Sequence, residues 1–310
     1  MSKLAVIGSG LIGRAWAIVF ARAGFDVALW DPAPEATAAA LRFAEARLPE
    51  LQQAGLLRGE APDAVRARMH PVEEFGAALA GAIWVQENGP ERVDVKRDLF
   101  ADMDRLVGPE TILASSTSAI PISRFTGTLA ARQRCIVAHP VNPPYLLPLV
   151  ELCPAPWTDP EVLRRAQALM REAGMVPAVV SREVQGFILN RLQAALLGEA
   201  FRLVEEGVAT QADVDATVKH GLGLRWSFMG PFETIDLNAP GGLPDYCDRY
   251  AQALLEMQEQ MRPRPVSEEL VARLTAERRA ALPEADHASR QEWRDRRLMG
   301  LLAHKAGQPE

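Results

Sequence analysis

A glycine-rich turn near the N-terminus constrains the fold of this chain more than any other feature. The apolar run at residues 4–7 is followed at once by the pattern G-x-G-x-x-G at residues 8–13. Residues 14–23 then have apolar side chains at helical spacing, and the apolar run 27–30 ends in Asp31. A buried strand, a glycine turn, a helix and a second strand within about 30 residues predict a parallel β-α-β unit.

The three glycines of this turn have different roles. Gly8 allows the tight turn, Gly10 lets a pyrophosphate approach the backbone, and Gly13 lets the helix pack against the strand. The N-terminus of the helix offers N–H groups and the positive end of its dipole to the phosphates. Asp31 can accept hydrogen bonds from ribose hydroxyls and would repel a 2′-phosphate. The turn therefore predicts a site for NAD rather than NADP; the alternative is a glycine turn without a ligand.

Strands and helices alternate along the first part of the chain. Apolar runs predict strands at 82–87, 112–115 and 135–138, and helical spacing predicts helices at 34–57 and 91–106. The charged, proline-containing residues 58–71 indicate a surface excursion. This alternation predicts an α/β Rossmann-like fold with a doubly wound, mostly parallel sheet.

The pattern changes near residue 183. From there on the apolar spacing is helical, and no segment is typical of a strand. The predicted helices are 186–206, 211–220, 231–237, 243–261, 267–281 and 289–304. We therefore expect an NAD-binding Rossmann-like domain at 1–185, followed by an all-α domain for substrate binding and dimerisation at 186–310.

A histidine and a glutamate flank a proline-rich reversal of the chain. The apolar run 135–138 ends in His139, and a second apolar run contains Glu151. If the chain folds back midway, near Tyr145, these two side chains face each other. A carboxylate on one imidazole nitrogen raises the basicity of the other, which can then take the proton of a hydroxyl that loses hydride to NAD⁺. The alternative is a histidine at a strand end beside a solvated glutamate.

Three polar residues are candidates for contact with a substrate. Ser118 follows the predicted strand 112–115, at the end where ligands bind to open α/β sheets, although a turn or helix N-cap serine is the alternative. Asn142 follows His139 in the proline-rich segment and can hold the base or a substrate oxygen. Asn190 lies among apolar residues of the first helix of the second domain, so its amide needs a partner; the alternative is an ordinary hydrogen bond between the domains.

Composition and charge exclude several classes of protein. The net charge of −6 gives no overall attraction to nucleic acid or to an anionic membrane. The three cysteines are widely spaced and the five histidines are not clustered, which fits neither a disulfide framework nor a metal site. No apolar run is long enough to span a membrane. The N-terminus lacks the charged segment followed by a long apolar segment that is typical of a signal peptide. We expect a cytoplasmic protein without a bound metal.

These motifs together resemble the L-3-hydroxyacyl-CoA dehydrogenase superfamily. The resemblance rests on the glycine turn, Ser-Ser-Thr-Ser at 115–118, His-Pro-Val-Asn-Pro at 139–143, Glu151 and Gly-Phe-Ile-Leu-Asn-Arg at 186–191. Residues 138–145, 221–226, 246–250 and 293–295 are most similar to the lambda-crystallin / L-gulonate 3-dehydrogenase branch. The resemblance implies a Rossmann-like domain, a helical domain that forms a homodimer, and NAD-dependent oxidation of a 3-hydroxyl group.

The resemblance also implies roles for single residues. His139 matches the catalytic base and Glu151 its partner, and the polar residues around the reacting oxygen match Ser118, Asn142 and Asn190.

For the cofactor, the resemblance implies backbone contacts from Leu11 and Ile12 to the phosphates, and Asp31 as the ribose acid. Glu91 and Lys96 match positions near the nicotinamide. From the residues alone, this last pair indicates a solvated helix face with spaced charges.

The chain departs from the acyl-CoA enzymes in ways that bear on its substrate. Pro140-Val141 replaces an aromatic pair after the histidine, and a Leu-Arg-Trp element precedes Gly230. Arg225 of this element can clamp a carboxylate, with a surface or interface arginine as the alternative. A clamp implies a free L-3-hydroxy acid, and the branch points to L-gulonate, oxidised to 3-dehydro-L-gulonate.

Other functions stay open at this point. An L-carnitine dehydrogenase would also need a box for the trimethylammonium group, for which Trp30, Tyr145 and Trp226 are candidates. A 3-hydroxybutyryl-CoA dehydrogenase would need a basic entrance for phosphates. A crystallin-like structural protein would need neither the His139–Glu151 pair nor the glycine turn. Amphipathic helices in the second domain predict a homodimer.

Overall fold

The computed structural model describes residues 1–308 of the chain. By packing, the chain divides into two compact units: Met1–Asn190 together with the segment from Ser289 onward, and Arg191–Ala288. The C-terminal segment thus lies with the sheet rather than with the helices that precede it. The predicted domain boundary at residue 185 stays a prediction.

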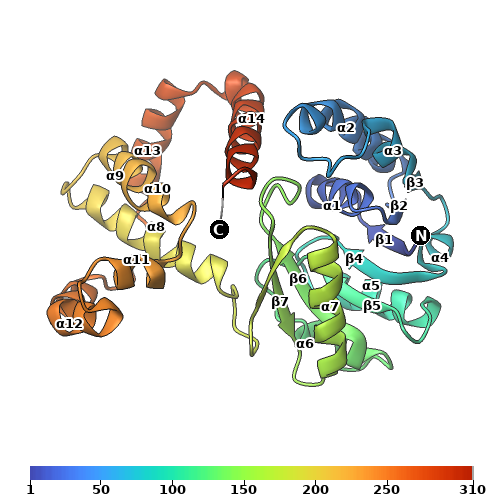
Figure 1. Cartoon of the computed structure of the whole chain (residues 1–310). Helices are drawn as coiled ribbons and strands as arrows, with labels where there is room; N and C mark the ends of the chain where they lie inside the picture. Colours follow the sequence, from blue (N-terminus) through green and yellow to red (C-terminus); the bar gives the residue numbers. More distant parts are fainter. Residues whose placement is uncertain (309–310) are drawn as a thin grey trace. The chain divides into compact units, whose positions relative to one another are not determined.

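The first unit is built on an eight-stranded sheet with the order β3-β2-β1-β4-β5-β6-β7-β8 (Figure 1). Neighbouring strands pair in parallel, except that β7 runs antiparallel to β6. The prediction of a Rossmann-like, mostly parallel sheet is confirmed. The strands are β1 Lys3–Ile7, β2 Asp26–Trp30, β3 Met69–Pro71, β4 Ala82–Glu87, β5 Ile112–Ser115, β6 Cys135–Pro140, β7 Leu149–Pro154 and β8 Val176–Val179.

Apolar clusters on both faces of this sheet bury it, which is why its strands read as nearly continuous apolar runs. Helices α1, α2, α7 and α14 contribute to one cluster, and α5 and α6 contribute to the other. The helices and helical turns of this unit are α1 Leu11–Arg22, α2 Pro34–Gln53, α3 Pro62–Ala67, α4 Phe75–Leu79, α5 Val93–Leu106, α6 Ser123–Thr126, η1 Arg132–Arg134, α7 Pro160–Glu172 and α14 His287–Ala306.

The segment 58–71 lies mostly at the surface, as its charge and prolines indicated, but it is regular rather than irregular structure. It forms α3 and the edge strand β3, and the side chains of Val65 and Met69 are buried in the core. Charged and polar residues surround these two apolar positions, so composition alone does not reveal the helix and the strand.

The order of the strands reverses between β1 and β4, which are neighbours in the sheet although β2 and β3 separate them in the chain. In open α/β sheets, ligands bind outside the carboxyl ends of the strands at such a point. The glycine turn follows β1, and β4, β5 and β6 end at the same edge. Because β7 is antiparallel to β6, its first residues also lie at this edge.

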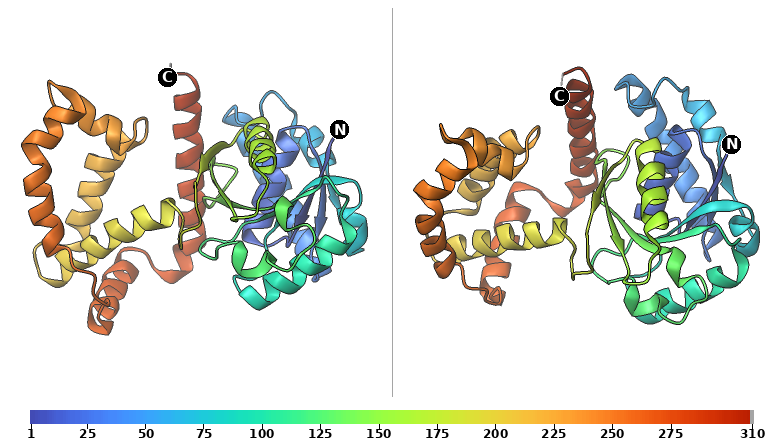
Figure 2. Two further views of the ribbon diagram at one scale, coloured as in Figure 1. Left: turned by 90° about the horizontal axis from the view of Figure 1, so that it is seen from below. Right: turned by 60° about the horizontal axis from the view of Figure 1, so that its bottom comes forward.

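The second unit consists of helices, and no strand occurs among the described residues 191–288 (Figure 2). Few of its side chains are buried: Val204, Thr234, Ala239 and Leu270. Its elements, with α8 starting at the end of the first unit, are α8 Leu189–Glu205, α9 Gln211–Thr217, the π-helical turn η2 Val218–Leu222, α10 Gly223–Trp226, α11 Pro231–Leu237, α12 Gly242–Gln260, α13 Glu268–Ala281 and η3 Glu284–Asp286. The all-α character predicted for this part is confirmed.

Two further features of the sequence have a structural outcome. Among the described residues, no helix has the length and apolar character needed to cross a membrane. Cys135, Cys153 and Cys247 are all free thiols, the first two buried and the third exposed.

Candidate active site

The glycine turn has the geometry that its sequence requires. Gly8 has a φ of +87°, and a Cβ there would lie 2.9 Å from the carbonyl oxygen of Asn88. A Cβ on Gly13 would lie only 1.8 Å from the carbonyl oxygen of Gly8, so the start of α1 and the end of β1 touch through this glycine. Gly10, by contrast, has no atom within 4 Å of a Cβ position. Gly8 and Gly13 are therefore tightly packed within the turn, whereas space is free beside Gly10.

This open position coincides with the free end of α1. The helix begins at Leu11, Gly10 is its N-cap without a side-chain cap, and no acidic residue lies in its first turn. The N–H groups of Leu11 and Ile12 are thus at the helix end that attracts phosphate. The buried hydroxyl oxygen of Ser9 also has no hydrogen-bond partner among residues 1–308. These features fit a dinucleotide pyrophosphate.

Asp31 fixes the glycine turn from the end of β2. Its Oδ2 accepts a hydrogen bond from the Ser9 N–H at 2.7 Å, and its Oδ1 accepts one from the Ala33 N–H at 3.0 Å. Each carboxylate oxygen has a second acceptor position. Asp31 can therefore hold the turn and still accept hydrogen bonds from a ribose, whereas a 2′-phosphate would meet its negative charge.

His139 and Glu151 meet as predicted. They are directly paired residues of the antiparallel strands β6 and β7. His139 Nδ1 lies 2.8 Å from Glu151 Oε2, and the two residues are 6% and 1% exposed. The ring of Phe187 packs against the imidazole with centroids 5.6 Å apart. Nε2 of His139 has no partner among residues 1–308, so this nitrogen can accept a proton when Nδ1 carries the hydrogen toward Glu151.

The second oxygen of Glu151 holds the start of α8. Oε1 accepts hydrogen bonds from the N–H groups of Ile188 at 2.7 Å and Leu189 at 2.9 Å. Burial raises the pKa of Glu151, but the hydrogen bonds from His139 and these two N–H groups more than compensate and lower the pKa below its ordinary value. Glu151 therefore stays ionised, as a partner of an imidazolium must.

Asn190 and Ser118 are also brought together. Asn190 is the second residue of α8, and its Nδ2 donates a hydrogen bond to the carbonyl oxygen of Ser118 at 2.6 Å. Ser118 in turn donates its N–H to Glu91 Oε1 at 2.9 Å, with its hydroxyl 3.3 Å from the same oxygen. The side chain of Ser118 is exposed. Its hydroxyl can therefore turn toward a bound molecule.

Lys96 does not lie on the solvated helix face that the residues alone indicated, whereas the side chain of Glu91 is 40% exposed. Glu91 precedes α5, and Lys96 is 1% exposed within it. Burial raises the pKa of Glu91, but hydrogen bonds from Thr117, Ala119 and Ser118, together with the charge of Lys96, lower it overall. Lys96 Nζ lies 3.6 Å from Glu91 Oε2. Both charges belong to a network inside the site.

Glu87 is a member of this network that the sequence analysis did not single out. It is fully buried at the end of β4, and both its oxygens lie 3.0 Å from Lys96 Nζ. It also accepts hydrogen bonds from the Ser115 hydroxyl at 2.5 Å and the Gly89 N–H at 2.6 Å. Glu87, like Asp31, is a carboxylate at the end of an apolar strand, and this pattern could have identified it from the sequence.

Other predicted residues form no hydrogen bond or ion pair with this network within residues 1–308. Asn142 is exposed, in the loop between β6 and β7. Arg225 is exposed in α10 of the second unit. Trp30, the first residue suggested for an aromatic box, packs on Phe75, and its indole N–H donates a hydrogen bond to the carbonyl of Glu73. Tyr145, the second, is 1% exposed, and the third, Trp226, lies in the second unit.

Comparison with known proteins gives the family. The model of the 3-hydroxyacyl-CoA dehydrogenase NAD binding domain matches residues 3–184, and that of the 3-hydroxyacyl-CoA dehydrogenase C-terminal domain matches residues 186–282. The chain is 42% identical to lambda-crystallin of Oryctolagus cuniculus over 97% of this chain and 95% of that protein. The chain belongs to the 3-hydroxyacyl-CoA dehydrogenase family.

Two further relatives agree with this assignment. An L-carnitine dehydrogenase of Pseudomonas sp is 37% identical over 97% of this chain and 93% of that protein. The crystal structure of 5-formyl-3-hydroxy-2-methylpyridine 4-carboxylic acid 5-dehydrogenase is similar over the full length of both chains, with a TM-score of 0.86 and 28% identity. This member of the 3-hydroxyacyl-CoA dehydrogenase family is an NAD-dependent oxidoreductase acting on CH–OH groups, and NAD is its cofactor.

Two glycine variants of this dehydrogenase separate cofactor binding from folding. Gly10→Ala should leave the melting temperature close to wild type, because its Cβ meets no atom, but should weaken NAD⁺ binding about tenfold by filling the phosphate position. Gly13→Ala should destabilise the fold by more than about 2 kcal/mol through overlap with Gly8. Thermal unfolding and titration calorimetry measure both effects. Wild-type affinity in Gly10→Ala would contradict the assignment of this turn.

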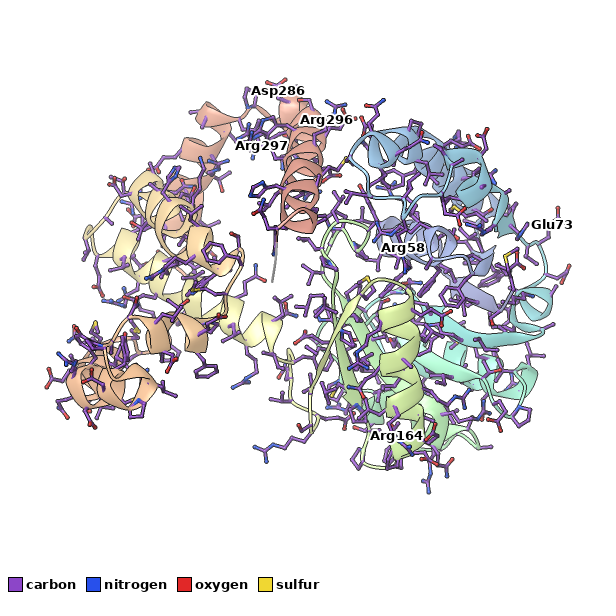
Figure 3. The ribbon with its side chains drawn as sticks, in the orientation of Figure 1. Arg58, Glu73, Arg164, Asp286, Arg296 and Arg297 are labelled. Carbon is purple, nitrogen blue, oxygen red and sulfur yellow. The ribbon has the colours of Figure 1, made fainter. Side chains whose placement is uncertain are left out.

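The lowered pKa of Glu151 predicts a pH-dependent contribution to stability. The ionised carboxylate stabilises the fold above the ordinary pKa, and this contribution is lost as the pH falls through the lowered pKa of the folded state. Glu151→Gln should therefore lower the free energy of unfolding by about 1–3 kcal/mol at pH 7, with a smaller difference at acid pH. Denaturant unfolding at several pH values measures this. The exposed Glu73 (Figure 3) provides the control, since Glu73→Gln should show no such trend.

Proposed function

We propose that this enzyme oxidises the 3-hydroxyl group of a small L-3-hydroxy acid with NAD⁺, and that the acid is L-gulonate, giving 3-dehydro-L-gulonate. The observation that carries the proposal is the buried His139–Glu151 pair, 2.8 Å apart at the carboxyl edge of the sheet. Oxidation of an alcohol requires loss of its hydroxyl proton, and a neutral imidazole oriented by a carboxylate is suited to accept it.

In the proposed mechanism each residue of the pair has one task. His139 receives the hydroxyl proton at Nε2, the nitrogen without a protein partner. Glu151 then stabilises the resulting imidazolium through its bond to Nδ1, and its ionised state favours this charge. NAD⁺, held at Gly8, Gly10 and Asp31, supplies the hydride acceptor when bound. The buried position of the pair limits exchange of the proton with water.

The substrate oxygen is assigned to the polar residues next to this pair. The hydrogen bond from Asn190 to the Ser118 carbonyl holds the two residues in one arrangement, and both lie near the start of α8 that Glu151 fixes. We propose that the Ser118 hydroxyl and the Asn190 amide orient the reacting oxygen. Asn142, exposed in the loop after His139, is proposed to contact the same substrate.

For the substrate carboxylate we propose Arg225. It is exposed in α10, and its guanidinium has no hydrogen bond or ion pair within the described part of the chain. A free acid bound in this way is favoured over a CoA thioester. L-Carnitine is the second candidate, because an L-carnitine dehydrogenase is 37% identical over nearly the whole chain. The burial of Tyr145 and the engagement of Trp30 argue against an open aromatic box for its trimethylammonium group.

We also propose that the chain forms a homodimer through its helical part. Helix α12 has no buried residue, and large apolar side chains of this unit are 62–77% exposed. Apolar surface of this extent is typical of an interface rather than of a free surface. A second copy of the same helices would present the same faces and cover them. The side chains in this range are Leu192, Val208, Leu224, Phe228, Phe232 and Leu237.

Turnover of four candidate substrates tests the reaction. NADH formation at 340 nm should be observed with L-gulonate and be weaker with L-carnitine, L-3-hydroxybutyrate and 3-hydroxybutyryl-CoA. His139→Asn should reduce kcat by at least about 10²-fold, since it removes the general base. The matched control is His70→Asn, because His70 lies half-exposed on the edge strand β3 and should not affect turnover.

The same assay tests the carboxylate clamp. Arg225→Met should raise the KM for L-gulonate about tenfold or more, while the Kd of NAD⁺ stays near wild type. Turnover of the CoA ester alone, unaffected by Arg225→Met, would exclude the free-acid proposal. Undiminished turnover by His139→Asn would exclude the proposed base.

Light scattering in solution tests the dimer. The expected mass is twice that of the 33.9 kDa chain. Phe232→Glu should shift the protein toward the monomer, because it places a charge within the proposed interface. Leu106→Glu alters a half-exposed leucine of the first unit and should leave the mass unchanged. A monomeric wild type at micromolar concentration would contradict the proposal.

A further inference from the structure

The loop that joins His139 to Glu151 is buried at its centre, over residues 143–146, and Tyr145 is the residue there whose side chain reaches the C-terminal helix. This loop connects β6 to β7, and Tyr145 at its centre is 1% exposed. The Tyr145 carbonyl accepts a hydrogen bond from the buried Arg22 of α1 at 2.8 Å. Its ring packs edge-on against Phe43 of α2, with centroids 5.9 Å apart. The loop is therefore fixed to the helices on one face of the sheet.

The hydroxyl group of Tyr145 is bound by the C-terminal helix. It donates a hydrogen bond to Asp295 Oδ2 of α14 at 2.9 Å. The other oxygen of Asp295 accepts from the Arg294 guanidinium at 2.7 and 2.9 Å, and Asp295 is 6% exposed. Burial, and then the charge of Asp295, raise the pKa of Tyr145, so the hydroxyl stays protonated and remains a donor.

Helix α14 is well anchored where this bond forms. Met299, one turn after Asp295, is 4% exposed and belongs to the same apolar cluster as Tyr145. The helix lies beyond residues 186–282, the part that matches the family's C-terminal domain. Asp295 is thus held by Arg294 on one oxygen and by the Tyr145 hydroxyl on the other, so its buried carboxylate has a partner on each side.

The hairpin formed by β6, this loop and β7 thus holds both chain segments that lead to the helical unit. Glu151 on β7 binds the N–H groups of Ile188 and Leu189 at the start of α8. Tyr145 in the loop binds Asp295 in α14. Between these two attachments stands the His139–Glu151 pair. The loop is the covalent connection between the two strands that carry this pair.

We propose that Tyr145 and Asp295 are positioning residues: their hydrogen bond fixes the β6–β7 loop, so that α14 sets the orientation of the His139–Glu151 pair and of Asn142. The expected effect on turnover rests on the proposed function of His139 as the base. The expected effect on the order of the loop is independent of that function.

Helix α14 also makes a contact that serves as an internal control. Arg296, labelled in Figure 3, pairs with Glu50 of α2 at 3.1 Å, and its side chain is 59% exposed. This ion pair attaches the same helix to the same unit without touching the loop. If α14 only stabilises the fold, loss of the Tyr145–Asp295 bond and loss of the Arg296–Glu50 pair should have the same kind of effect. Each should lower turnover only as far as it lowers stability.

The experiment compares four variants of the full-length enzyme. Tyr145→Phe keeps the ring and removes the hydroxyl, Asp295→Ala removes the acceptor, and Asp295→Asn keeps an acceptor oxygen. The control is Arg296→Ala. The measurements are kcat and KM for L-gulonate, the Kd of NAD⁺, and amide hydrogen exchange followed by mass spectrometry over residues 141–148 and 287–306.

The proposal expects kcat to fall about tenfold in Tyr145→Phe and Asp295→Ala, because misplacement of the base lowers the rate without changing cofactor contacts. The Kd of NAD⁺ should change less than about twofold. Exchange in 141–148 should rise in both variants, while Asp295→Asn regains most of the rate and Arg296→Ala resembles wild type.

Other results would overturn it. Wild-type kcat and exchange in Tyr145→Phe would show that the bond does not fix the loop, and an equal loss of kcat in Arg296→Ala would show a structural role only. If the wild-type enzyme oxidises none of the candidate acids, the proposed function fails. The exchange data then decide by themselves: a rise over 141–148 in Tyr145→Phe supports the positioning role, and no rise excludes it.

Discussion

The Glu151 carboxylate is nearly inaccessible to water, so its charge has to be stabilised by protein hydrogen bonds alone. One oxygen faces His139 and the other accepts two N–H groups at the start of α8. These bonds lower its pKa, so the carboxylate stays ionised beside the imidazole. A single buried charge thereby joins the sheet, the start of α8 and the proposed base. The same attachment fixes the backbone position of Asn190, which follows Leu189 directly in the chain.

A second buried ion pair organises the other side of the site. Lys96 lies between Glu87 and Glu91, and these carboxylates bind the backbone and hydroxyl groups of the segment that contains Ser118. Removing one partner of such a pair would leave an uncompensated buried charge, which is strongly destabilising. Since the Asn190 amide reaches the Ser118 carbonyl, the two networks meet, and the candidate groups of the first unit have defined positions before any substrate binds.

The two units differ in how completely a single chain buries them. The sheet is covered on both faces, whereas the helices of 191–288 bury few side chains and leave large apolar ones exposed. Helix α14 belongs to the covered unit although it comes last in the chain. Its Asp295 accepts the hydrogen bond of Tyr145 in the loop beside the proposed base, so the last helix contacts a segment that joins two site residues.

The sequence by itself determined the features that depend on local spacing. The glycine turn, Asp31 and the His139–Glu151 pair could be predicted because a β-α-β unit and a short reversal bring together residues that are close in the chain. Only the tertiary structure decided contacts between distant segments. Glu87 with Lys96 looks from the sequence like a strand end and a helix face, and Asp295 is separated from Tyr145 by half of the chain. Such pairs leave no periodic signal, because burial and packing rather than spacing select them.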